Sequence, residues 1–419
     1  MKIDETIDEL DGSTPIANVG NVPNTKSSPY DYGEGNGKFD YSLGYKTFLE
    51  RDSRTVIEQE HPAVSFDGTQ FLVVWNEFRT QSPQLYAARV RADGTVVDTT
   101  GFVVRGGVPV LTAPRVSFNG THHLVVWQSG GLHGRRVARD GTVVDSTTDL
   151  SLTSSSAYPQ DLGTVASDGT GWLLTWSDHR GSNGDIYASL VLPDGSHAPS
   201  DIAVATGTPD QSHPSAGFDG MHYVIAWAQL DFSTAAISLH GRQLAPDGTL
   251  SPQVMYASSS AHDPVVVGNG HGVLVAYETG GSAAVVPVGL DGVPGRSVRF
   301  TSATTIQYNL TGAFDGTHHI VAWSESRSPS QDILAMRVRP DGTLVDSAPV
   351  VISDAPQYDN YPSAASDGRG HTLIAWQRAE LAGEYDPGRL RVRVLTNLAR
   401  GATCETAAQC ADGYCVDGV

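Results

Sequence analysis

The chain has 419 residues and a formal net charge of −19, because 46 acidic residues outnumber 27 lysines and arginines. That charge argues against nucleic-acid binding, since proteins that bind nucleic acid present a basic patch to the phosphates. No apolar run approaches the roughly 20 residues of a membrane-spanning helix, and 39% hydrophobic with 17% charged residues is typical of a soluble globular protein.

Residues 1–40 form the first segment, which is polar, aperiodic and rich in glycine, asparagine and serine. A segment of this composition buries too little apolar surface to fold, so we predict an extended or disordered arm. No signal peptide is visible at its start, and we expect any such peptide to have been removed or replaced.

A repeat fills the next segment, residues 41–397, which we predict to be one domain. Each copy has an apolar run, an Asp-Gly or Asn-Gly turn, an apolar run ending in an aromatic residue, a polar loop, and a run ending in another Asp-Gly. The copies follow one another at intervals of roughly 50 residues. Their first turns begin at Asp67, Asn119, Asp168, Asp219, Asn269, Asp315 and Asp367, and their aromatic residues are Trp75, Trp127, Trp176, Trp227, Tyr277, Trp323 and Trp376.

Each copy is predicted to form four strands, because Asp-Gly between apolar runs is a strong hairpin signal and six copies carry it twice. Runs such as FLVVW at 71–75 are apolar on both faces, as a strand covered on both sides requires. Four strands per roughly 50 residues is the period of a propeller blade. We therefore predict an all-β fold, a seven-bladed β-propeller of four-stranded blades; the alternative, a β-solenoid, usually has a shorter period.

The last copy has three predicted strands, near Ser363–Ser366, Leu373–Trp376 and Leu390–Leu395, and lacks a fourth. The segment YSLGYKTFLERD at 41–52 precedes the first copy with the spacing of a fourth strand. We predict that a strand near Tyr45–Leu49 closes the ring, since closure removes a free sheet edge.

Candidate binding residues precede the first strand of each blade, which lines the central channel of a propeller. They lie on the face with long, irregular loops, where binding residues concentrate. Such residues could bind a sugar, hold a metal, or supply an acid and a base; alternatively, the X-Pro steps among them only fix an extended strand start. The candidates are His61, Asp161, His213, His262, Asp263, Tyr308, Asn309 and Tyr361.

Three loops after the aromatic residue carry an acid two positions on and an arginine four positions on: Glu77 and Arg79, Asp178 and Arg180, Glu325 and Arg327. This recurrence fits an acid–arginine pair that ties down each loop, or a ring of arginines for an anionic ligand such as an acidic polysaccharide. Asp178 and Asp185 in DHRGSNGD are candidate Ca²⁺ ligands without EF-hand spacing. We expect that no cofactor is required.

Two pairs of adjacent histidines, 122–123 and 318–319, lie at strand starts beside the short turns. Adjacent strand residues point to opposite faces, so one pair cannot easily chelate one metal, and we interpret these histidines as structural. The sequence contains no Gly-x-Ser-x-Gly motif, phosphate loop or HExxH motif.

The tail, residues 398–419, contains Cys404, Cys410 and Cys415. Three closely spaced cysteines predict the start of a small disulfide module, and hence an oxidising compartment. Their odd number means that one is unpaired or, as we expect, that the module continues past residue 419. We therefore expect a secreted or cell-surface protein, and a monomer.

The tail, C…AAQC…GYCVDGV, resembles Cys-rich segments near the C-termini of secreted or surface-anchored myxobacterial proteins. The repeat, FDGT–x–x–LVVW followed by R-V-x-x-DGT-x-V-D, resembles secreted bacterial propellers. Together these resemblances span about residues 54–415 and imply export and fold, not chemistry. The turn SFDGT…W is similar to the Asp-box of sialidases, but it lacks the extra residue between Asp and Gly, and the Asp-box is itself structural.

Two functional classes fit these observations: a lectin-like or protein-binding module that uses the irregular face, for which a polysaccharide or cell-surface glycan is the expected partner, and a polysaccharide-active enzyme. The architecture resembles some polysaccharide lyases, which have His, Tyr and Arg at the channel mouth. That resemblance implies a Tyr or His that takes the proton alpha to a uronate carboxyl, and an Arg that neutralises this carboxyl. The candidates for these roles are His213, His262, Tyr308, Tyr361 and Arg180. An enzyme should have one chemically distinct sector, and a binding module several similar ones.

Overall fold

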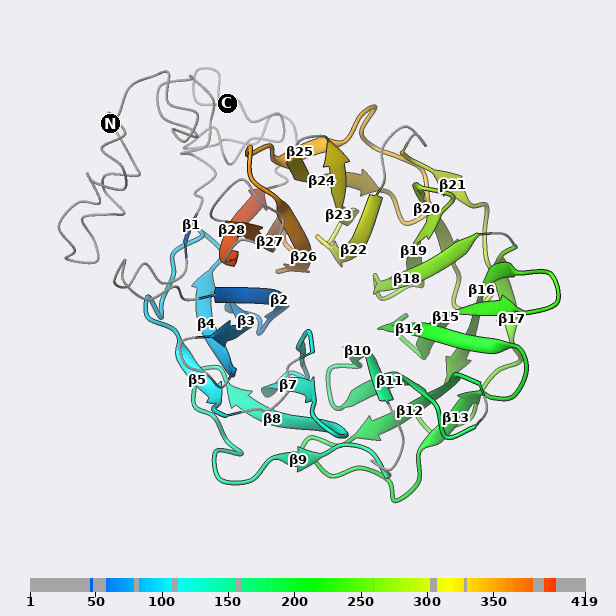
Figure 1. Cartoon of the computed structure of the whole chain (residues 1–419), viewed down its shortest axis with the longest axis horizontal. Coiled ribbons are helices and arrows are strands. Elements are labelled where there is room, and N and C mark those ends of the chain that lie inside the picture. Colours follow the sequence, from blue (N-terminus) through cyan, green and yellow to red (C-terminus); the bar gives the residue numbers. More distant parts are fainter. Residues whose placement is uncertain are drawn as a thin grey trace.

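The computed structural model describes residues 46–47, 58–78, 83–107, 112–154, 160–181, 183–258, 260–301, 307–327, 330–379 and 388–396. These residues form seven four-stranded antiparallel sheets, arranged radially around a central channel (Figure 1). The prediction of an all-β, seven-bladed propeller is therefore confirmed. The described residues contain no helix that is long and apolar enough to cross a membrane.

Blades 1 to 6 each take four consecutive strands, and the first strand of each blade lies at the channel (Figure 1). Blade 1 has β2 (Glu58–Phe66), β3 (Gln70–Phe78), β4 (Gln84–Arg91) and β5 (Phe102–Arg105). Blade 2 has β6 (Arg115–Phe118), β7 (His122–Gln128), β8 (Leu132–Ala138) and β9 (Leu150–Ser151). Blade 3 has β10 (Gln160–Ser167), β11 (Trp172–Asp178), β12 (Asp185–Val191) and β13 (Ile202–Ala205).

The second half of the ring repeats this pattern. Blade 4 has β14 (Asp210–Phe218), β15 (Tyr223–Asp231), β16 (Ala236–Leu244) and β17 (Val254–Ala257). Blade 5 has β18 (Ala261–Gly268), β19 (Val273–Thr279), β20 (Ser282–Val288) and β21 (Val298–Arg299). Blade 6 has β22 (Gln307–Phe314), β23 (His319–Arg327), β24 (Ser330–Val338) and β25 (Val350–Ser353).

Blade 7 is built from both ends of the domain. It combines β26 (Asp359–Ser366), β27 (His371–Ala379) and β28 (Gly388–Thr396) with β1 (Lys46–Thr47). β1 pairs antiparallel with β28, with Lys46 opposite Val392 and Thr47 opposite Arg391. The predicted closing strand is therefore confirmed. The predicted arm at 1–40 and the tail at 398–419 with its cysteines lie outside the described residues.

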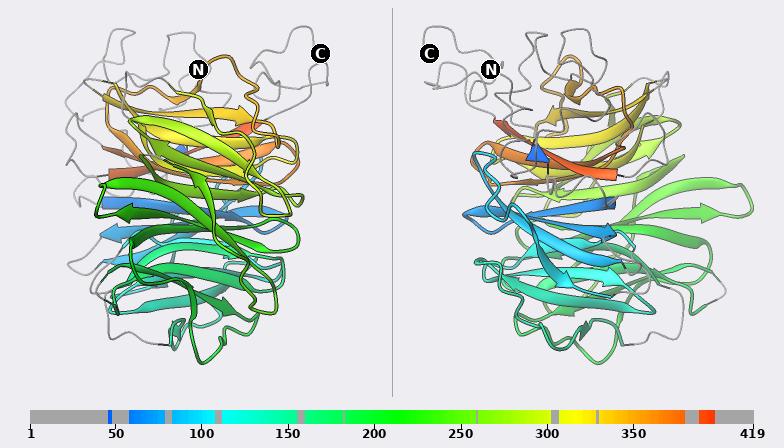
Figure 2. Two further views of the ribbon diagram at one scale, coloured as in Figure 1. Left: turned by 90° about the vertical axis from the view of Figure 1, so that its right-hand side faces the viewer. Right: turned by 60° about the vertical axis from the view of Figure 1, so that its left-hand side comes forward.

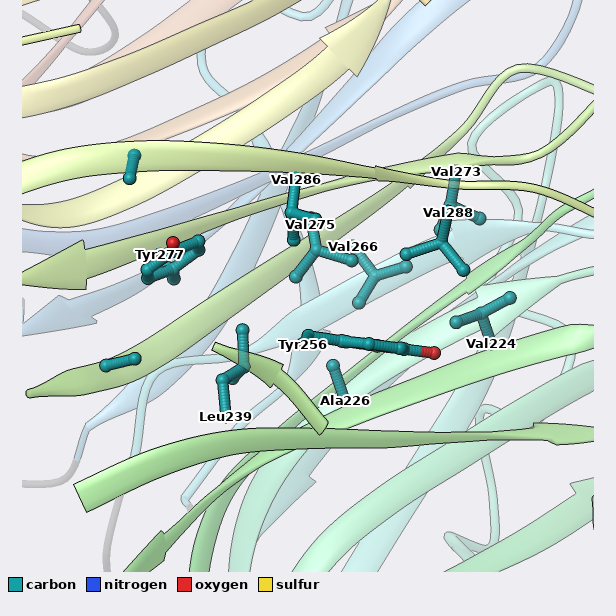
Figure 3. Close-up of a cluster of buried hydrophobic side chains, with 12 residues drawn as sticks. Val224, Ala226, Leu239, Tyr256, Val266, Val273, Val275, Tyr277, Val286 and Val288 are labelled. Atoms are coloured by element: carbon teal, nitrogen blue, oxygen red, sulfur yellow. The ribbon is translucent and has the colours of Figure 1, made fainter. Parts of the chain in front are cut away.

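The core is divided among the interfaces between blades, and the side views in Figure 2 show the sheets stacked on one another. Each interface between neighbouring blades holds one cluster of buried apolar side chains. Figure 3 shows the cluster between blades 4 and 5, where Tyr256 lies among Val224 and Ala226 of its own blade and Val266 of the next. Both faces of an inner strand are therefore buried, which explains runs such as FLVVW.

The Asp-Gly turns are structural, as predicted. Asp67 Oδ1 accepts hydrogen bonds from the backbone N–H groups of Thr69 and Gln70, at 2.7 and 2.8 Å. Gly68, which follows Asp67, has φ of 93°, a conformation that glycine adopts at little cost. The same pair of acceptor bonds recurs at Asn119, Asp168, Asp219 and Asp315.

Candidate functional site

The first strand of the blades carries a β-bulge at the channel mouth, where the sequence predicts the site. In six blades the pairing of the first two strands shifts register there, as between Glu60 and Ala63 in β2. Extended backbone has negative φ, so the interpretation that X-Pro only fixes an extended strand start is wrong for the four of five left-handed bulge residues that precede a proline; Asn309 precedes Leu310. The five residues have φ between 49° and 55°, and they are His61, His213, Asp263, Asn309 and Tyr361.

The left-handed backbone of these residues is costly, of order 1–3 kcal/mol each for a residue other than glycine. Asp, Asn and His tolerate it best, and Tyr361 is the bulky exception. A bulge also changes the direction in which its side chain points. The left-handed backbone therefore sets the direction of these five side chains at a cost in stability.

The side chains of these five bulge residues contact side chains of neighbouring blades. The rings of His61 and Tyr361 have centroids 4.4 Å apart, and the Asn309 side chain donates a 2.8 Å hydrogen bond to Asn360 Oδ1. His213 Nδ1 lies 3.6 Å from Asp263 Oδ1. The structure thus brings together predicted residues of blades 7 and 1 and of blades 4 and 5, and it joins the predicted Asn309 of blade 6 to Asn360 of blade 7.

Two other predicted mouth residues are placed differently. Asp161 at the start of β10 has a side chain that is 74% exposed, and its carboxylate lies 3.8 Å from His179 Nε2. Tyr308 is half-buried on β22, opposite Ser324 of β23. Neither residue belongs to the groups of contacting side chains described above.

Arg115, the first residue of β6, is a channel-mouth residue that the sequence analysis missed. Its Nε donates to the carbonyl of Gly163 at 2.7 Å, and its Nη1 donates to the carbonyl of Pro114 at 3.1 Å. Among the described residues its partners are carbonyl groups, with no carboxylate. Burial lowers the pKa of Arg115. Burial and, after it, the charge of Arg115 lower the pKa of His61. A cation whose described partners are carbonyl groups therefore lies on the first strand of blade 2, close enough to His61 for its charge to act there.

A second group of ionisable side chains lies where blade 5 meets blade 4. His262 Nδ1 is 2.9 Å from Asp263 Oδ2 and 3.9 Å from Glu278 Oε2. Glu278 comes from β19, where it pairs with His262 of β18. His213 of β14 approaches Asp263 from the other side. Two imidazoles and two carboxyls from adjacent blades therefore converge, and we call these four residues the blade 4/5 cluster.

Burial and mutual charge shift the pKa values in this cluster. Burial, reinforced by the negative charge of Asp263, raises the pKa of Glu278 to about 7. The hydrogen bond to Asp263 raises the pKa of His262. Burial acts to raise the pKa of Asp263, but the bond from His262 and the charges of His213 and His262 hold it below its ordinary value. Near neutral pH, one carboxyl is thus ionised and the other is close to its midpoint.

Glu278 was not among the residues predicted from the sequence, although the repeat contains a signal for it. The position after the central aromatic residue is occupied by Asn76, Gln128, Ser177, Ala228, Glu278, Ser324 and Gln377. Its side chain reaches the next blade: Ser324 Oγ donates to Asn360 Oδ1 at 3.0 Å, and Gln377 Oε1 accepts from the His61 N–H at 3.4 Å. Alignment of the copies shows that only blade 5 has an ionisable residue there.

The acid of the Trp-x-acid-x-Arg motif belongs to a buried network. Glu77 accepts hydrogen bonds from the Trp75 indole N–H at 2.8 Å and from the Gln59 side chain at 3.3 Å. Blades 3 and 6 repeat this arrangement with Trp176, Asp178 and Gln160, and with Trp323, Glu325 and Gln307. The motif therefore joins the first two strands of the blade.

The two described arginines of this motif, Arg180 and Arg327, each pair with the acid of the motif. Arg180 lies 2.6 Å from Asp178 and 2.9 Å from Asp201, and it stacks 3.9 Å above the Tyr187 ring. Arg327 Nε lies 2.8 Å from Glu325. This is the geometry of a pair that ties down a loop. Arg79 lies outside the described residues, and the ligand-binding role of the three arginines stays a prediction.

The candidate calcium ligands face each other across two paired strands. Asp178 ends β11, and Asp185 begins β12 directly opposite. Asp178 Oδ1 and Oδ2 accept hydrogen bonds from Arg180 at 2.9 and 2.6 Å, and Asp185 Oδ1 accepts one from the Gly207 N–H at 2.7 Å. A calcium ion at this position would have to displace these donors.

The paired histidines occupy opposite faces of their strands. His123 is buried, with Nδ1 2.6 Å from Ser65 Oγ of the neighbouring blade, whereas His122 is partly exposed. The buried His319 likewise contacts Asn269 of blade 5, at 3.2 Å. Their contacts link adjacent blades.

Comparison with known proteins shows the fold alone. No protein family matches the sequence, and no curated protein matches it significantly. Among solved structures, the chain is similar to the acylaminoacyl peptidase of Pyrococcus horikoshii, with 7% identity, a TM-score of 0.51, and coverage of 83% of this chain and 53% of that chain. A prolyl endopeptidase gives 17% identity, a TM-score of 0.51, and coverage of 77% and 46%. This chain thus spans about half the length of these two peptidases.

A third similar structure is the β-propeller domain of the Trilobed protease from Pyrococcus furiosus, with 8% identity, a TM-score of 0.50, and coverage of 82% of this chain and 94% of that domain. That domain is described as having an open velcro topology, whereas here β1 pairs with β28. The protein is a seven-bladed β-propeller whose channel mouth gathers ionisable and aromatic side chains.

Proposed function

We propose that this protein is a secreted, ligand-binding propeller that binds a glycan at its channel mouth, with an acidic sugar residue held by Arg115. The observation that carries the proposal is the state of this guanidinium, whose partners among the described residues are carbonyl groups. A guanidinium matches the planar geometry of a carboxylate and can donate two parallel hydrogen bonds to it. An anionic ligand would supply the missing countercharge.

The aromatic pair next to Arg115 supports a sugar as the ligand. Tyr361 is 37% exposed, and its ring lies against that of His61 at the mouth. An aromatic ring with a polar tip can pack against the apolar face of a sugar and donate or accept a hydrogen bond at the same time. Left-handed backbone holds both residues in place. The mouth therefore combines an apolar contact with a positive charge, as an acidic sugar residue requires.

The net charge of −19 gives this proposal a distinctive salt dependence. An acidic protein repels a polyanion over distances beyond the Debye length, which is roughly 8–10 Å at physiological salt. The contact with Arg115 acts at short range and is screened less. Moderate salt should therefore strengthen retention of an acidic glycan, which is the opposite of what a basic polyanion-binding surface shows.

Retention on immobilised acidic and neutral glycans tests the proposal. The wild type should be retained on an acidic glycan, and Arg115→Gln should lose that retention because it removes the charge. The matched control is Arg369→Gln, which removes one charge from an exposed turn between β26 and β27 on the opposite face. Equal retention of all three proteins would sink the role of Arg115, and equal retention on neutral glycans would sink the acidic ligand.

A polysaccharide lyase is the second candidate function, and the asymmetry of the mouth favours it. Only blade 5 places a carboxyl at the position after the central aromatic residue, so one sector is chemically distinct. His213 or Tyr361 would take the proton alpha to the uronate carboxyl, and Arg115 would neutralise that carboxyl. New absorbance from unsaturated uronate ends, lost in His213→Ala or Tyr361→Phe, is the expected result. Retention without new absorbance would reject the lyase and keep the binding module.

A further inference from the structure

The blade 4/5 cluster gathers negative charge without a permanent cation. His262, Asp263 and Glu278 each offer one ligand atom, and these atoms all lie within 4.8 Å of one another. Among the described residues, no lysine or arginine forms an ion pair with Asp263 or Glu278; their charged neighbours are His213 and His262. Two carboxyls held this close, one of them largely buried, favour a bound cation.

The spacing of the ligand atoms suits a small divalent ion. Two ligands at 2.0–2.1 Å from a tetrahedral ion lie about 3.3 Å apart. His262 Nδ1 lies 2.9 Å from Asp263 Oδ2 and 3.9 Å from Glu278 Oε2, so two of the three separations bracket that value, and the third is at most 4.8 Å. Small side-chain rotations would therefore complete the geometry.

We propose that His262 Nδ1, Asp263 Oδ2 and Glu278 Oε2 bind one divalent transition-metal ion of the Zn²⁺ class. An imidazole ligand selects this class, because Ca²⁺ and Mg²⁺ take oxygen ligands. His213 Nδ1 hydrogen-bonds Ser212 Oγ at 3.1 Å and lies 3.6 Å from Asp263 Oδ1, the oxygen that does not face His262, so it borders the ligating carboxylate without a hydrogen bond to it.

The number of ligands agrees with this assignment. Three protein ligands leave a fourth position for water or a ligand group. A sugar oxygen bound at the mouth could occupy that position.

The metal site does not depend on the proposed glycan binding. Its ligands come from β18 and β19, whereas Arg115 belongs to β6 of blade 2. Arg115→Gln should therefore leave metal uptake unchanged. Conversely, loss of metal uptake in a blade 5 variant says nothing about Arg115, whose role is tested by glycan retention.

Calorimetric titration of the metal-free full chain with ZnCl₂ tests the site. The wild type should bind one more equivalent than Glu278→Gln or His262→Gln. His213→Gln should keep that equivalent, because His213 lies beside Asp263 and is not one of the three ligands. The matched control is His371→Gln, because His371 Nδ1 lies 2.7 Å from Asp367 Oδ2 in a turn on the opposite face; it should behave as the wild type.

Two further measurements separate this site from other sources of binding. Zn²⁺ held by the cysteines of the tail would persist in Glu278→Gln, and Co²⁺ in place of Zn²⁺ would then show a sulfur-to-metal charge-transfer band. Thermal unfolding of the metal-free variants establishes that they fold; if Glu278→Gln does not, His262→Gln carries the test because His262 is partly exposed.

Three results would overturn the proposal. The first is equal stoichiometry in the wild type, Glu278→Gln and His262→Gln. The second is loss of the same equivalent in His371→Gln. The third is equally tight binding of Ca²⁺, which would contradict the assigned metal class.

Discussion

Blade 7 carries the charges of the buried network in inverted order. In blades 1, 3 and 6 a glutamine on the first strand donates to an acid two residues after the tryptophan, as Gln59 does to Glu77. In blade 7 Asp359 stands in the place of the glutamine, and Arg378 stands in the place of the acid. Arg378 Nε and Nη2 donate to Asp359 Oδ1 and Oδ2 at 2.8 and 2.9 Å.

The substitution Arg378→Glu should strongly destabilise the protein. Asp359 is fully buried, and without Arg378 it keeps the hydroxyl of Ser353 as a partner but has no countercharge. Removing one member of a buried ion pair costs about 3–5 kcal/mol, because the other charge stays buried without compensation. The new carboxylate adds repulsion, so we expect a loss at the upper end of that range.

The double variant Asp359→Gln/Arg378→Glu should recover most of this loss. It gives blade 7 the arrangement of blade 1, with the amide on the first strand and the carboxylate on the second. The coupling between the two substitutions should exceed about 2 kcal/mol, since residues that share one buried network are not additive.

Urea unfolding followed by tryptophan fluorescence measures both effects, because all seven tryptophans are at most 1% exposed. Arg369→Glu makes the same charge change at an exposed turn of blade 7 and should stay within about 0.5 kcal/mol of the wild type. A loss below about 1 kcal/mol in Arg378→Glu, or a double variant no more stable than that single variant, would refute the reasoning.

Three further predictions concern pH, packing and ring closure. Burial lowers the pKa of His319 from 6.5 to about 4, so the unfolded chain binds a proton that the folded state does not. The free energy of unfolding should therefore fall by about 3 kcal/mol as pH drops from 6.5 to 4. Urea unfolding midpoints at each pH measure this fall, and an equally steep fall in His319→Gln would reject the prediction. Trp75→Ala should cost about 3–5 kcal/mol in urea unfolding, because the indole fills the interface with blade 7, and a loss below 1 would contradict that packing. A chain that starts at residue 58 lacks β1, exposes the edge of β28 and should aggregate more than the full chain by light scattering; unchanged scattering would count against closure by β1.

The sequence predicted the repeating features of the fold because they arise from local chemistry. Asp-Gly turns need only a glycine and a carboxylate that accepts nearby N–H groups, as at Asp67 and Gly68. Apolar runs on both faces of a strand required neighbours on both sides. The closing strand could be predicted because blade 7 visibly lacked one. Ring order also placed His61 and Tyr361 at one mouth, although they are 300 residues apart in the chain.

The parts of the candidate site that carry the proposals were decided by tertiary structure. The X-Pro steps predicted extended backbone, but register shifts between paired strands impose left-handed backbone at Asp263 and Tyr361. The further partners of an arginine depend on residues more distant in the chain: Arg180 meets Asp201 in addition to the nearby Asp178, whereas Arg115 meets the carbonyl of Gly163.

The period of the repeat therefore determined the architecture of this protein, because each blade repeats the same turns and apolar strand runs. The chemistry of the mouth depends on departures from that repeat, such as the single carboxylate Glu278 among amides and small residues. Its raised pKa results from its burial and from the charge of Asp263 on the paired strand of the same blade. Charge interactions depend on distance in space rather than along the chain. The closed ring therefore determines which ionisable side chains lie close enough to interact.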